Sequence, residues 1–289
     1  MRNFIFIPIV LLTLCSCDPM QRTINIPDVK FKSYLIEHFD NDRDSEISKA
    51  EAILVDKIEI NTDKIYSLEG IEHFINLEYL VCNGSYEDGT AYGQLTSVDV
   101  SDLIYLIEFW CKNNKISTLN VENNRMLELL YCNNNQITSI NTKNNERLDG
   151  YGCANNKISI IDVSQNRALT SLICSNNNIS SIDIGNNVML EFFACQDNNL
   201  TTINTLKNVS LKDFFCDSNN LSNLDVSKNR ELVWLDCDNN NLSTLDVSNN
   251  QELEWLDCTN NQQLNELWLH HGQTIVLFFK DDHTIIKYK

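Results

Sequence analysis

Short runs of apolar residues alternate with polar ones in a unit that recurs along most of the chain. In one copy, Leu232, Leu235 and Cys237 are apolar at the spacing of a strand, and residues 242–247 supply a second apolar run. Alternate residues of a strand point to opposite faces, so the first run predicts a short strand with one face directed inward. Polar residues separate the two runs, which predicts a tight coil.

The unit repeats every 21 residues, with cysteine at its third apolar position and two asparagine series in the same register. An asparagine side chain can replace a backbone partner at a turn, so stacked asparagines would pair groups that are otherwise buried. The period predicts a solenoid whose repeats bury their apolar faces against each other. The cysteines are Cys111, Cys132, Cys153, Cys174, Cys195, Cys216, Cys237 and Cys258, and the asparagines are Asn114, Asn135, Asn156, Asn177, Asn198, Asn219, Asn240 and Asn261, then Asn124, Asn145, Asn166, Asn187, Asn208, Asn229 and Asn250.

The pattern L-x-x-L-x-C-x-x-N-x-L resembles the leucine-rich-repeat signature. Its 21-residue form is similar to internalin-type repeats and to their relatives in bacterial surface lipoproteins. The resemblance covers residues 55–269. It implies an α/β-type, mostly β solenoid, in which a right-handed parallel β coil lines a concave face. In internalin-like proteins this face engages partner proteins, so the resemblance also implies a protein ligand.

The array is irregular at both ends. A repeat without cysteine begins at Val55, and 29 residues separate Cys82 from Cys111, so eight residues are inserted there. Residues 84–93 are polar, aromatic and punctuated by glycine, which predicts a projecting loop. In residues 270–289 we expect two strands, 274–279 and 284–288, that form a β cap, because an uncovered sheet edge invites aggregation.

Residues 27–54 predict a short helical cap at the N-terminal end. Asp28 opens a helix over 29–39, and the acidic segment after it resembles an EF-hand loop. Ser45 replaces the glycine that the loop needs at positive φ, which costs about 1 kcal/mol and lowers the expected affinity. The alternative is a solvated acidic turn between two helices. The calcium ligands that the resemblance implies are Asp40, Asp42, Asp44, Glu46 through its carbonyl, Ser48 and Glu51.

The first 16 residues resemble a lipoprotein signal peptide. Arg2 precedes an apolar run over 4–14 that is short for a membrane span. Leu14-Cys15-Ser16-Cys17 resembles a lipobox, which implies lipidation of Cys17 and a tether over 17–26. The expected location is therefore the bacterial cell envelope, at the outer membrane or cell surface. An ordinary signal peptide or a terminal anchor helix is the alternative.

Charge and cysteine spacing limit the partners and the chemistry. The formal net charge of -18 argues against nucleic acid and favours basic partners or cations, and the alternative is that it only keeps an exported protein soluble. The repeat cysteines share one inward position on strands that stack about 4.8 Å apart, beyond the ~3.8 Å between the Cβ atoms of a disulfide. A straight row also cannot surround a zinc ion. We therefore expect free, buried thiols.

Large side chains occupy the strand positions that point away from the core. Exposed aromatic rows usually mark contact surfaces, although these rings could instead pack on each other along the sheet. Carboxylates alternate with them, among them Asp217 and Asp238, and such a surface suits a basic protein or, alternatively, a carbohydrate. The predicted ligand-binding residues are Trp110, Tyr131, Phe192, Phe215, Trp234, Asp236, Trp255 and Asp257.

The sequence contains no recognisable motif for catalysis. The five histidines fall in no recognisable catalytic or metal spacing, and the chain contains no nucleophile elbow, P-loop or dinucleotide fingerprint. The sequence therefore predicts a lipid-anchored module that binds a protein ligand and is not an enzyme. A carbohydrate-binding lipoprotein and a structural envelope spacer are the alternatives. Calcium at the cap loop is the one cofactor that the sequence suggests.

Overall fold

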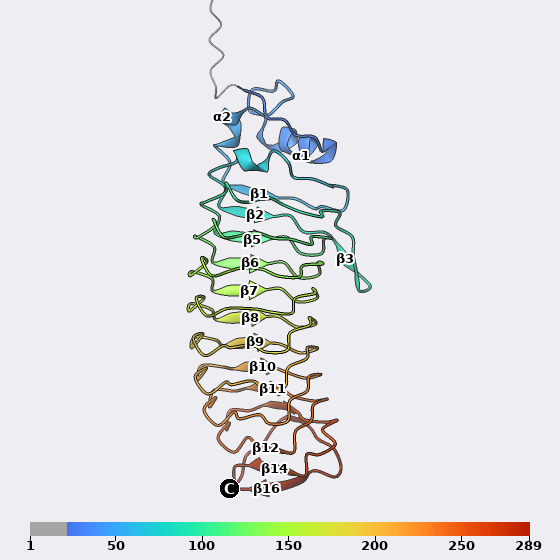
Figure 1. Ribbon diagram of the computed structural model, residues 1–289, viewed down its shortest axis with the longest axis vertical. Coiled ribbons are helices and arrows are strands. Elements are labelled where there is room, and N and C mark those ends of the chain that lie inside the picture. Colours follow the sequence, from blue (N-terminus) through green and yellow to red (C-terminus); the bar gives the residue numbers. More distant parts are fainter. Residues whose placement is uncertain (1–21) are drawn as a thin grey trace, which may run out of the picture.

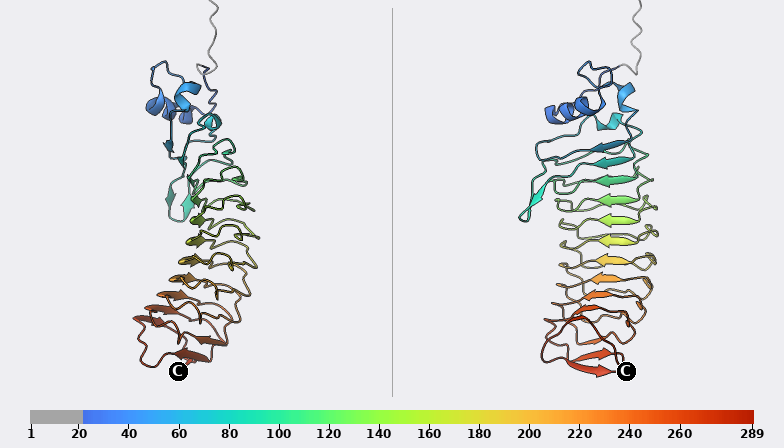
Figure 2. Two further views of the ribbon diagram at one scale, coloured as in Figure 1. Left: turned by 90° about the vertical axis from the view of Figure 1, so that its left-hand side faces the viewer. Right: turned by 180° about the vertical axis from the view of Figure 1, so that it is seen from behind.

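The computed structural model describes residues 22–289. They form a long solenoid with a helical cap at the N-terminal end (Figure 1), and the stack of coils is curved (Figure 2). The expected lipidation residue, Cys17, lies outside the described residues. Within the described part, no helix has the length and apolar character needed to cross a membrane.

Each coil of the solenoid contributes one strand to a parallel sheet of 11 strands. Every strand residue pairs with the equivalent residue of the next coil, as Tyr131 does with Gly152. The cysteines that follow, Cys132 and Cys153, therefore stack in register, which confirms the predicted parallel solenoid. The strands are β1 (Lys57–Glu59), β2 (Tyr79–Val81), β5 (Glu108–Trp110), β6 (Leu129–Tyr131), β7 (Gly150–Gly152), β8 (Ser171–Ile173), β9 (Phe192–Ala194), β10 (Asp213–Phe215), β11 (Trp234–Asp236), β13 (Trp255–Asp257) and β15 (Leu277–Phe279).

A second, three-stranded sheet forms on the last coils. The two strands expected in residues 270–289 are present, but each pairs in parallel with the preceding coil. Phe278 and Ile286 remain partly exposed at inward positions, whereas Leu256 and Leu267, one coil earlier, are buried. This segment therefore continues the solenoid by one more coil at its C-terminal end. The strands are β12 (Thr244–Asp246), β14 (Glu266–Leu269) and β16 (Ile285–Tyr288).

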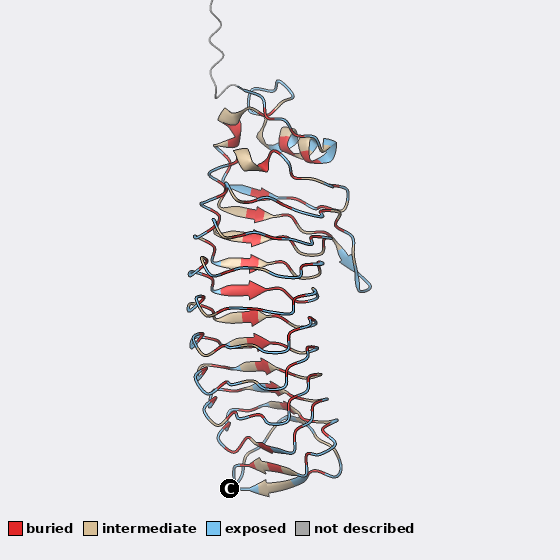
Figure 3. Cartoon of the chain, in the orientation of Figure 1, coloured by how far each residue is buried: buried red, intermediate tan, exposed pale blue. Residues whose placement is uncertain are grey.

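Apolar side chains and thiols fill the inside of the coils. In the long sheet, the middle residue of every strand except β15 is buried, while most flanking residues keep some exposure (Figure 3). The nine described cysteines are buried and free. Burial raises the pKa of the Cys153 thiol to about 12, because a thiolate would lose its hydration there. These thiols are therefore uncharged packing groups.

The first asparagine series joins neighbouring coils, as expected. The Asn135 Oδ1 atom accepts the Ile116 N–H at 2.9 Å. Its Nδ2 atom donates to the carbonyl oxygens of Cys111 and Cys132 at 2.9 and 3.0 Å. One buried carboxamide thus pairs backbone groups on two coils, which would otherwise be left unsatisfied.

The cap contains α1 (Val29–Phe39), α2 (Lys49–Ala52) and a short 3₁₀ helix (Ile71–His73). One Asp28 carboxylate oxygen accepts N–H groups at the start of α1. The other accepts the Tyr66 N–H at 2.8 Å, which joins the cap to the first repeat. Burial raises the pKa of Asp28, but these hydrogen bonds outweigh it and hold the pKa below its usual range.

The segment before α1 also belongs to the cap. The Ile24 N–H donates to the Ile47 carbonyl at 2.7 Å, and Thr23 forms an antiparallel bridge with Ser48. Ile24 and Ile26 are buried. Residues 22–26 are thus packed structure, and the tether expected over 17–26 is wrong for this part because its apolar side chains find a core.

Candidate ligand-binding face

The long sheet presents its outer face on the inner side of the curve (Figure 2). The first and third residues of each strand project from this face, and all eight predicted ligand-binding residues occupy such positions. Each of them is partly exposed. The structure divides them into two clusters, because a strand without side-chain bulk on this face lies between them.

The larger cluster is a row of rings on the C-terminal half of the face. Ring centroids lie 5.5 Å apart for Phe192 and Phe215, and 5.9 Å apart for Phe215 and Trp234. Trp234 and Trp255 stack at 4.5 Å, and Phe279 extends the row at 5.4 Å from Trp255. Phe279 was missed by sequence reasoning, because one added residue after Asn261 shifts its segment out of the period. The rings thus pack on each other and remain accessible.

The smaller cluster joins Trp110 and Tyr131, whose centroids are 4.9 Å apart. The Lys112 Nζ atom lies 4.6 Å from the centre of the Trp110 ring. A Cβ atom on Gly152 would lie 2.5 Å from Tyr131 Cδ1, and one on Gly150 would lie 2.7 Å from Tyr131 Oη. Both glycines of β7 are therefore needed for the Tyr131 ring to lie across that strand.

Three carboxylates converge beside the larger cluster. One carboxylate oxygen from each of Asp217, Asp236 and Asp238 lies within 4.8 Å of the other two. Burial, followed by repulsion from Asp217, raises the pKa of Asp236 to about 7. Burial, followed by repulsion from Asp238 and Asp197, raises the pKa of Asp217 to about 6. The pattern indicates carboxylates that share a site without enough compensating positive charge.

Asp257 belongs to the same face but not to this cluster. It follows Asp236 in the sheet register. Its Oδ1 atom accepts the backbone N–H of Thr259 at 3.0 Å and the Thr259 hydroxyl at 2.8 Å. Its charge therefore contributes to the field on the face, while its hydrogen bonds stabilise the turn after β13.

In the cap loop, three of the six predicted calcium ligands come together. Oxygens of Asp40, Asp42 and Asp44 lie within 4.8 Å of one another. The Asp44 N–H lowers the pKa of Asp42, but desolvation and neighbouring carboxylates outweigh it, so this pKa is raised. Ser45 adopts a φ of 67°, as the position requires. Serine thus takes the left-handed backbone at the place where the sequence lacks the expected glycine.

The other three predicted ligands have structural partners. The Glu51 carboxylate accepts the Asn41 N–H at 2.8 Å and, through its second oxygen, the Ser48 N–H at 2.8 Å. The Ser48 hydroxyl donates to Glu51 and caps α2. Glu46 forms an ion pair of 2.6 Å with Lys32. Glu51 and Ser48 would have to exchange these bonds for a metal ion.

The inserted residues form a hairpin of β3 (Tyr86–Glu87) and β4 (Thr90–Ala91), which projects from the solenoid (Figure 1). Its base is fixed by the Gly93 N–H, which donates to the Asn113 carbonyl at 3.0 Å. A groove of about 410 Å³ lies between the hairpin and the turns that follow the strands. The groove is lined by Tyr86, Gly89, Ala91, Asn114, Lys115, Asn134, Asn135, Gln136, Asn155 and Asn176.

A chain of carboxamides runs along this groove. The Nδ2 atoms of Asn176, Asn155 and Asn134 each donate, at 2.6 Å, to the asparagine one coil earlier. Asn113 ends the chain by donating to the Gly84 carbonyl of the hairpin at 2.9 Å. These asparagines have positive φ, a conformation that asparagine tolerates well. The consecutive asparagines in the sequence carry the signal for this chain of hydrogen bonds, but the predicted asparagine series contains only one residue of each pair.

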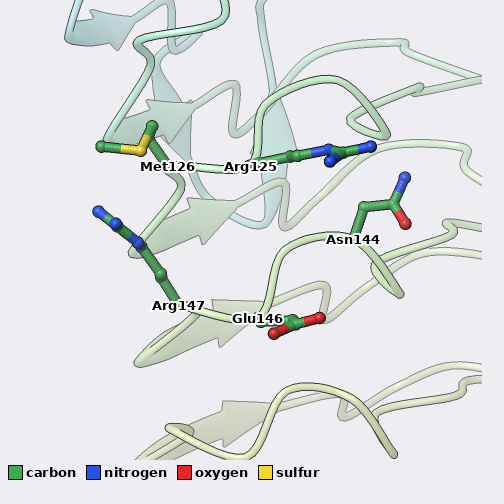
Figure 4. A pocket seen from close by; sticks show the side chains of 5 residues that line it. All are labelled: Arg125, Met126, Asn144, Glu146 and Arg147. Carbon is green, nitrogen blue, oxygen red and sulfur yellow. The ribbon is translucent and has the colours of Figure 1, made fainter.

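A separate hollow of about 380 Å³ lies between two outer turns (Figure 4). Arg125, Met126, Asn144, Glu146 and Arg147 line it. The side chains of Arg125 and Arg147 point to opposite sides, so they do not converge on one ligand atom (Figure 4). This hollow has no arrangement that suggests catalysis.

Comparison with known proteins identifies the fold. No protein-family model matches the chain, and no curated protein matches it. The functional domain of InlJ from Listeria monocytogenes, which includes a cysteine ladder, is 27% identical. That match covers 92% of this chain and 73% of the domain, with a TM-score of 0.58. The chain is thus similar to a domain that also includes a cysteine ladder.

Two further solved structures share the fold. The internalin InlF from Listeria monocytogenes is 22% identical over 87% of this chain and 84% of its own, with a TM-score of 0.58. The leucine-rich-repeat ectodomain of the Arabidopsis thaliana receptor kinase GASSHO1/SCHENGEN3 was solved in complex with Casparian strip integrity factor 2. It is 16% identical over 78% of this chain and 34% of its own, with a TM-score of 0.53. The chain therefore has a leucine-rich-repeat solenoid fold with internalin-type structural neighbours.

Proposed function

We propose that this chain is a lipid-anchored binding module of the bacterial cell envelope that recognises a protein ligand through the concave face. The observation that carries the proposal is the row of five rings from Phe192 to Phe279, which stays accessible beside converging carboxylates. Tryptophan and tyrosine supply large contact areas with few rotatable bonds, and they dominate the energetics of many interfaces. Trp234, which is 37% exposed, is the most accessible tryptophan of the row.

The structural neighbours support a binding role. Solved internalin structures share the solenoid fold, and a receptor ectodomain of the same fold was solved in complex with Casparian strip integrity factor 2. A rigid sheet also suits recognition, because little conformational entropy is lost when a preformed face binds. The ligand would contact the rings first and be oriented by the charges beside them.

The test is affinity capture with matched tryptophan variants. The full chain is used as bait against extracts of cell envelopes and host cells, and captured proteins are then titrated individually. We expect Trp234→Ala with Trp255→Ala to weaken binding at least tenfold, the effect of losing about 1.4 kcal/mol. Trp268→Ala is the control, because this ring lies on the other sheet under Lys287 and Lys289. Equal affinity in all variants would contradict binding at the concave face.

A carbohydrate is the second candidate ligand, and the groove under the hairpin favours it. Asn134, Asn155 and Asn176 repeat donor and acceptor groups along the groove, and Tyr86 provides an aromatic surface. Sugars are recognised by such combinations of ring stacking and amide hydrogen bonds. A glycan array should then show binding that Tyr86→Ala weakens and that Trp234→Ala leaves unchanged.

The lipid anchor rests on the residues before the described part. Leu14-Cys15-Ser16-Cys17 resembles a lipobox, and acyl chains on Cys17 would hold the module at the membrane. A fatty-acid probe should label the wild type and the Cys15→Ala variant. Cys17→Ala should remove the label, and so should inhibition of the lipoprotein signal peptidase. Protease treatment of intact cells would distinguish a surface location from one inside the envelope.

A further inference from the structure

The converging carboxylates of Asp217, Asp236 and Asp238 have no positively charged partner within residues 22–289. The lysine ion pairs of this part of the chain involve other carboxylates, such as Glu191 with Lys212 at 2.8 Å. Like charges this close repel each other unless a cation lies among them. The described part of the chain supplies no cation at this point of the face.

Hydrogen-bond donors are also scarce at this point. The carboxylate of Asp236 accepts only a long hydrogen bond of 3.4 Å from the Asp238 N–H. The Asp238 carboxylate accepts one of 3.5 Å from Asn260 Nδ2. At the equivalent place one repeat before Asp217, the Gln196 Oε1 atom is buried without a partner. Within residues 22–289, acceptors thus outnumber donors around these three carboxylates, which is the complement of a cationic side chain.

The same protein shows how a cation fits such a ring. In the repeat of β5, Lys112 follows the strand cysteine and places Nζ 4.6 Å from the centre of Trp110. Trp268 likewise lies under Lys287 and Lys289, at 5.3 and 4.9 Å. Two of the four tryptophans are thus covered by the chain's own lysines.

Trp234 and Trp255 are the two tryptophans that lack such a lysine in the described chain. At the repeat position that Lys112 occupies near Trp110, the C-terminal repeats carry Asp217 and Asp238. The repeat of β5 thus carries a positive charge over its ring, whereas the C-terminal repeats carry negative charges beside their rings. This exchange makes the larger cluster complementary to a cation that comes from outside.

We propose that the C-terminal half of the concave face binds an arginine side chain of the protein ligand. The guanidinium would have the rings of Phe215 and Trp234 on one side and the carboxylates of Asp217, Asp236 and Asp238 on the other. This assignment rests on the proposed function, and it names the chemistry of the partner. Arginine fits better than lysine because its planar guanidinium stacks on rings and presents five N–H donors to neighbouring acceptors. The net charge of -18 would also steer a basic segment toward the protein.

The test compares a hexa-arginine peptide with a hexa-citrulline peptide by calorimetric titration of the full chain. Citrulline keeps the shape of arginine without its charge. We expect the arginine peptide to bind the wild type, and Asp236→Asn with Asp238→Asn to weaken it at least tenfold. The matched control is Asp162→Asn with Asp225→Asn on the outer turns, where the carboxylates accept N–H groups that asparagine also accepts. This control should change affinity less than twofold.

Three results would overturn the proposal. The control pair, Asp162→Asn with Asp225→Asn, could weaken binding as much as Asp236→Asn with Asp238→Asn. That result would mean that only long-range electrostatic attraction holds the peptide. Citrulline could bind as well as arginine, or a hexa-lysine peptide could bind as tightly, which would exclude guanidinium recognition. Circular dichroism and melting of the Asp236→Asn, Asp238→Asn protein verify that it is folded.

Failure of this proposal is distinguishable from failure of the proposed function. If a captured protein ligand depends on Trp234 and Trp255 while arginine peptides do not bind, the concave face is the binding surface and the arginine assignment is wrong. If arginine peptides bind as expected while every captured ligand ignores both tryptophans, the arginine site stands and the general proposal for the face is wrong.

Discussion

The Thr142 hydroxyl donates to the Asn166 carboxamide oxygen at 2.9 Å, across one coil of the solenoid. Thr205 and Asn229 repeat this bond at the same distance. In the other repeats of this asparagine series, valine or isoleucine occupies the threonine position, and the carboxamide oxygen is buried without a partner. These unpaired oxygens belong to Asn124, Asn145, Asn187, Asn208 and Asn250.

Thr142→Val is therefore expected to destabilise the protein. The substitution removes the donor of a buried bond and leaves the Asn166 oxygen unsatisfied, which costs about 1 kcal/mol. Urea unfolding followed by tryptophan fluorescence measures the loss. Thr142→Ser keeps the hydroxyl and should retain more of the stability. If valine and serine variants unfold at the same urea concentration, the bond contributes nothing.

The converse change at the preceding repeat tests the same relationship. Val121 lies one coil before Asn145, at the position equivalent to Thr142. Val121→Thr should provide the missing donor for the Asn145 oxygen. The variant should therefore lose less stability than a Val→Thr variant at a position without such an acceptor. Val100→Thr, which faces Asn124, should behave alike.

Asp236 makes stability depend on pH. Its folded pKa is about 7 and its ordinary value is 3.8, so the folded state holds a proton that the unfolded state releases. The stabilisation that this bound proton gives the folded state is fully present below the ordinary pKa of Asp236, and it is lost as the pH rises through about 7. Asp236→Asn should therefore stabilise the protein at pH 8 by about 1 kcal/mol, a value reduced for solvent screening, and have a smaller effect at pH 5.

Urea unfolding of both proteins at pH 5 and pH 8 measures this difference. Repulsion from Asp217, Asp238 and Asp257 contributes to the raised pKa of Asp236, and coupled carboxylates lose their protons over a wide pH range, so the transition should be broad. Asp162→Asn is the control, because hydrogen bonds from Ser164 hold the pKa of Asp162 low and no loss near neutral pH is expected. An equal gain at pH 5 and pH 8 would contradict the pKa assignment.

We also propose that calcium binds the cap loop weakly. Asp40, Asp42 and Asp44 repel each other, and a divalent ion would relieve that repulsion. Because Glu51 and Ser48 must give up their mutual bonds, the affinity should be in the range of about 10⁻⁴–10⁻³ M found for extracellular modules. Several millimolar calcium should then raise the melting temperature by about 2–4 °C over EDTA.

Two variants make the calcium experiment specific. Asp42→Asn should abolish the shift, whereas Ser45→Gly should enlarge it, because glycine adopts the φ of 67° without strain. Equal melting temperatures in calcium and EDTA would identify the loop as a structural turn only.

The nine described cysteines should resist labelling in the folded protein. Burial raises the pKa of Cys82 and Cys258 to about 12, so little thiolate is present at neutral pH. We expect no thiol of the repeats to react with a disulfide reagent until the protein unfolds, and all nine to react afterwards. Finding fewer than about eight reactive thiols after denaturation would show that some are paired.

The local elements of this fold were predictable because their signals are local. The helix expected over 29–39 has those bounds in the structure, since Asp28 caps its first turn. The insertion after Cys82 appears as a hairpin, because eight extra residues cannot fit into a coil of fixed length. The period predicted the stack itself, since identical coils bury their apolar side chains only in register.

The candidate site was only partly predictable. Strand alternation placed Trp110 and Trp234 on one outer face, but it did not show that β7 divides the face into two clusters. That division depends on Gly150 and Gly152, which leave space for the ring of Tyr131 from the previous coil. Which side chain fills such a space depends on packing between coils.

From the sequence alone, the repeat unit, the inward thiols and the asparagine turns followed, because each is set by a pattern that returns every 21 residues. Only the tertiary structure decided that Asp217, Asp236 and Asp238 converge, that Lys112 covers Trp110, and which carboxamide oxygens lack a donor. The physical reason is that these properties depend on distances between side chains of different coils. Rotamers and neighbouring side chains determine such distances, and a linear period does not specify them.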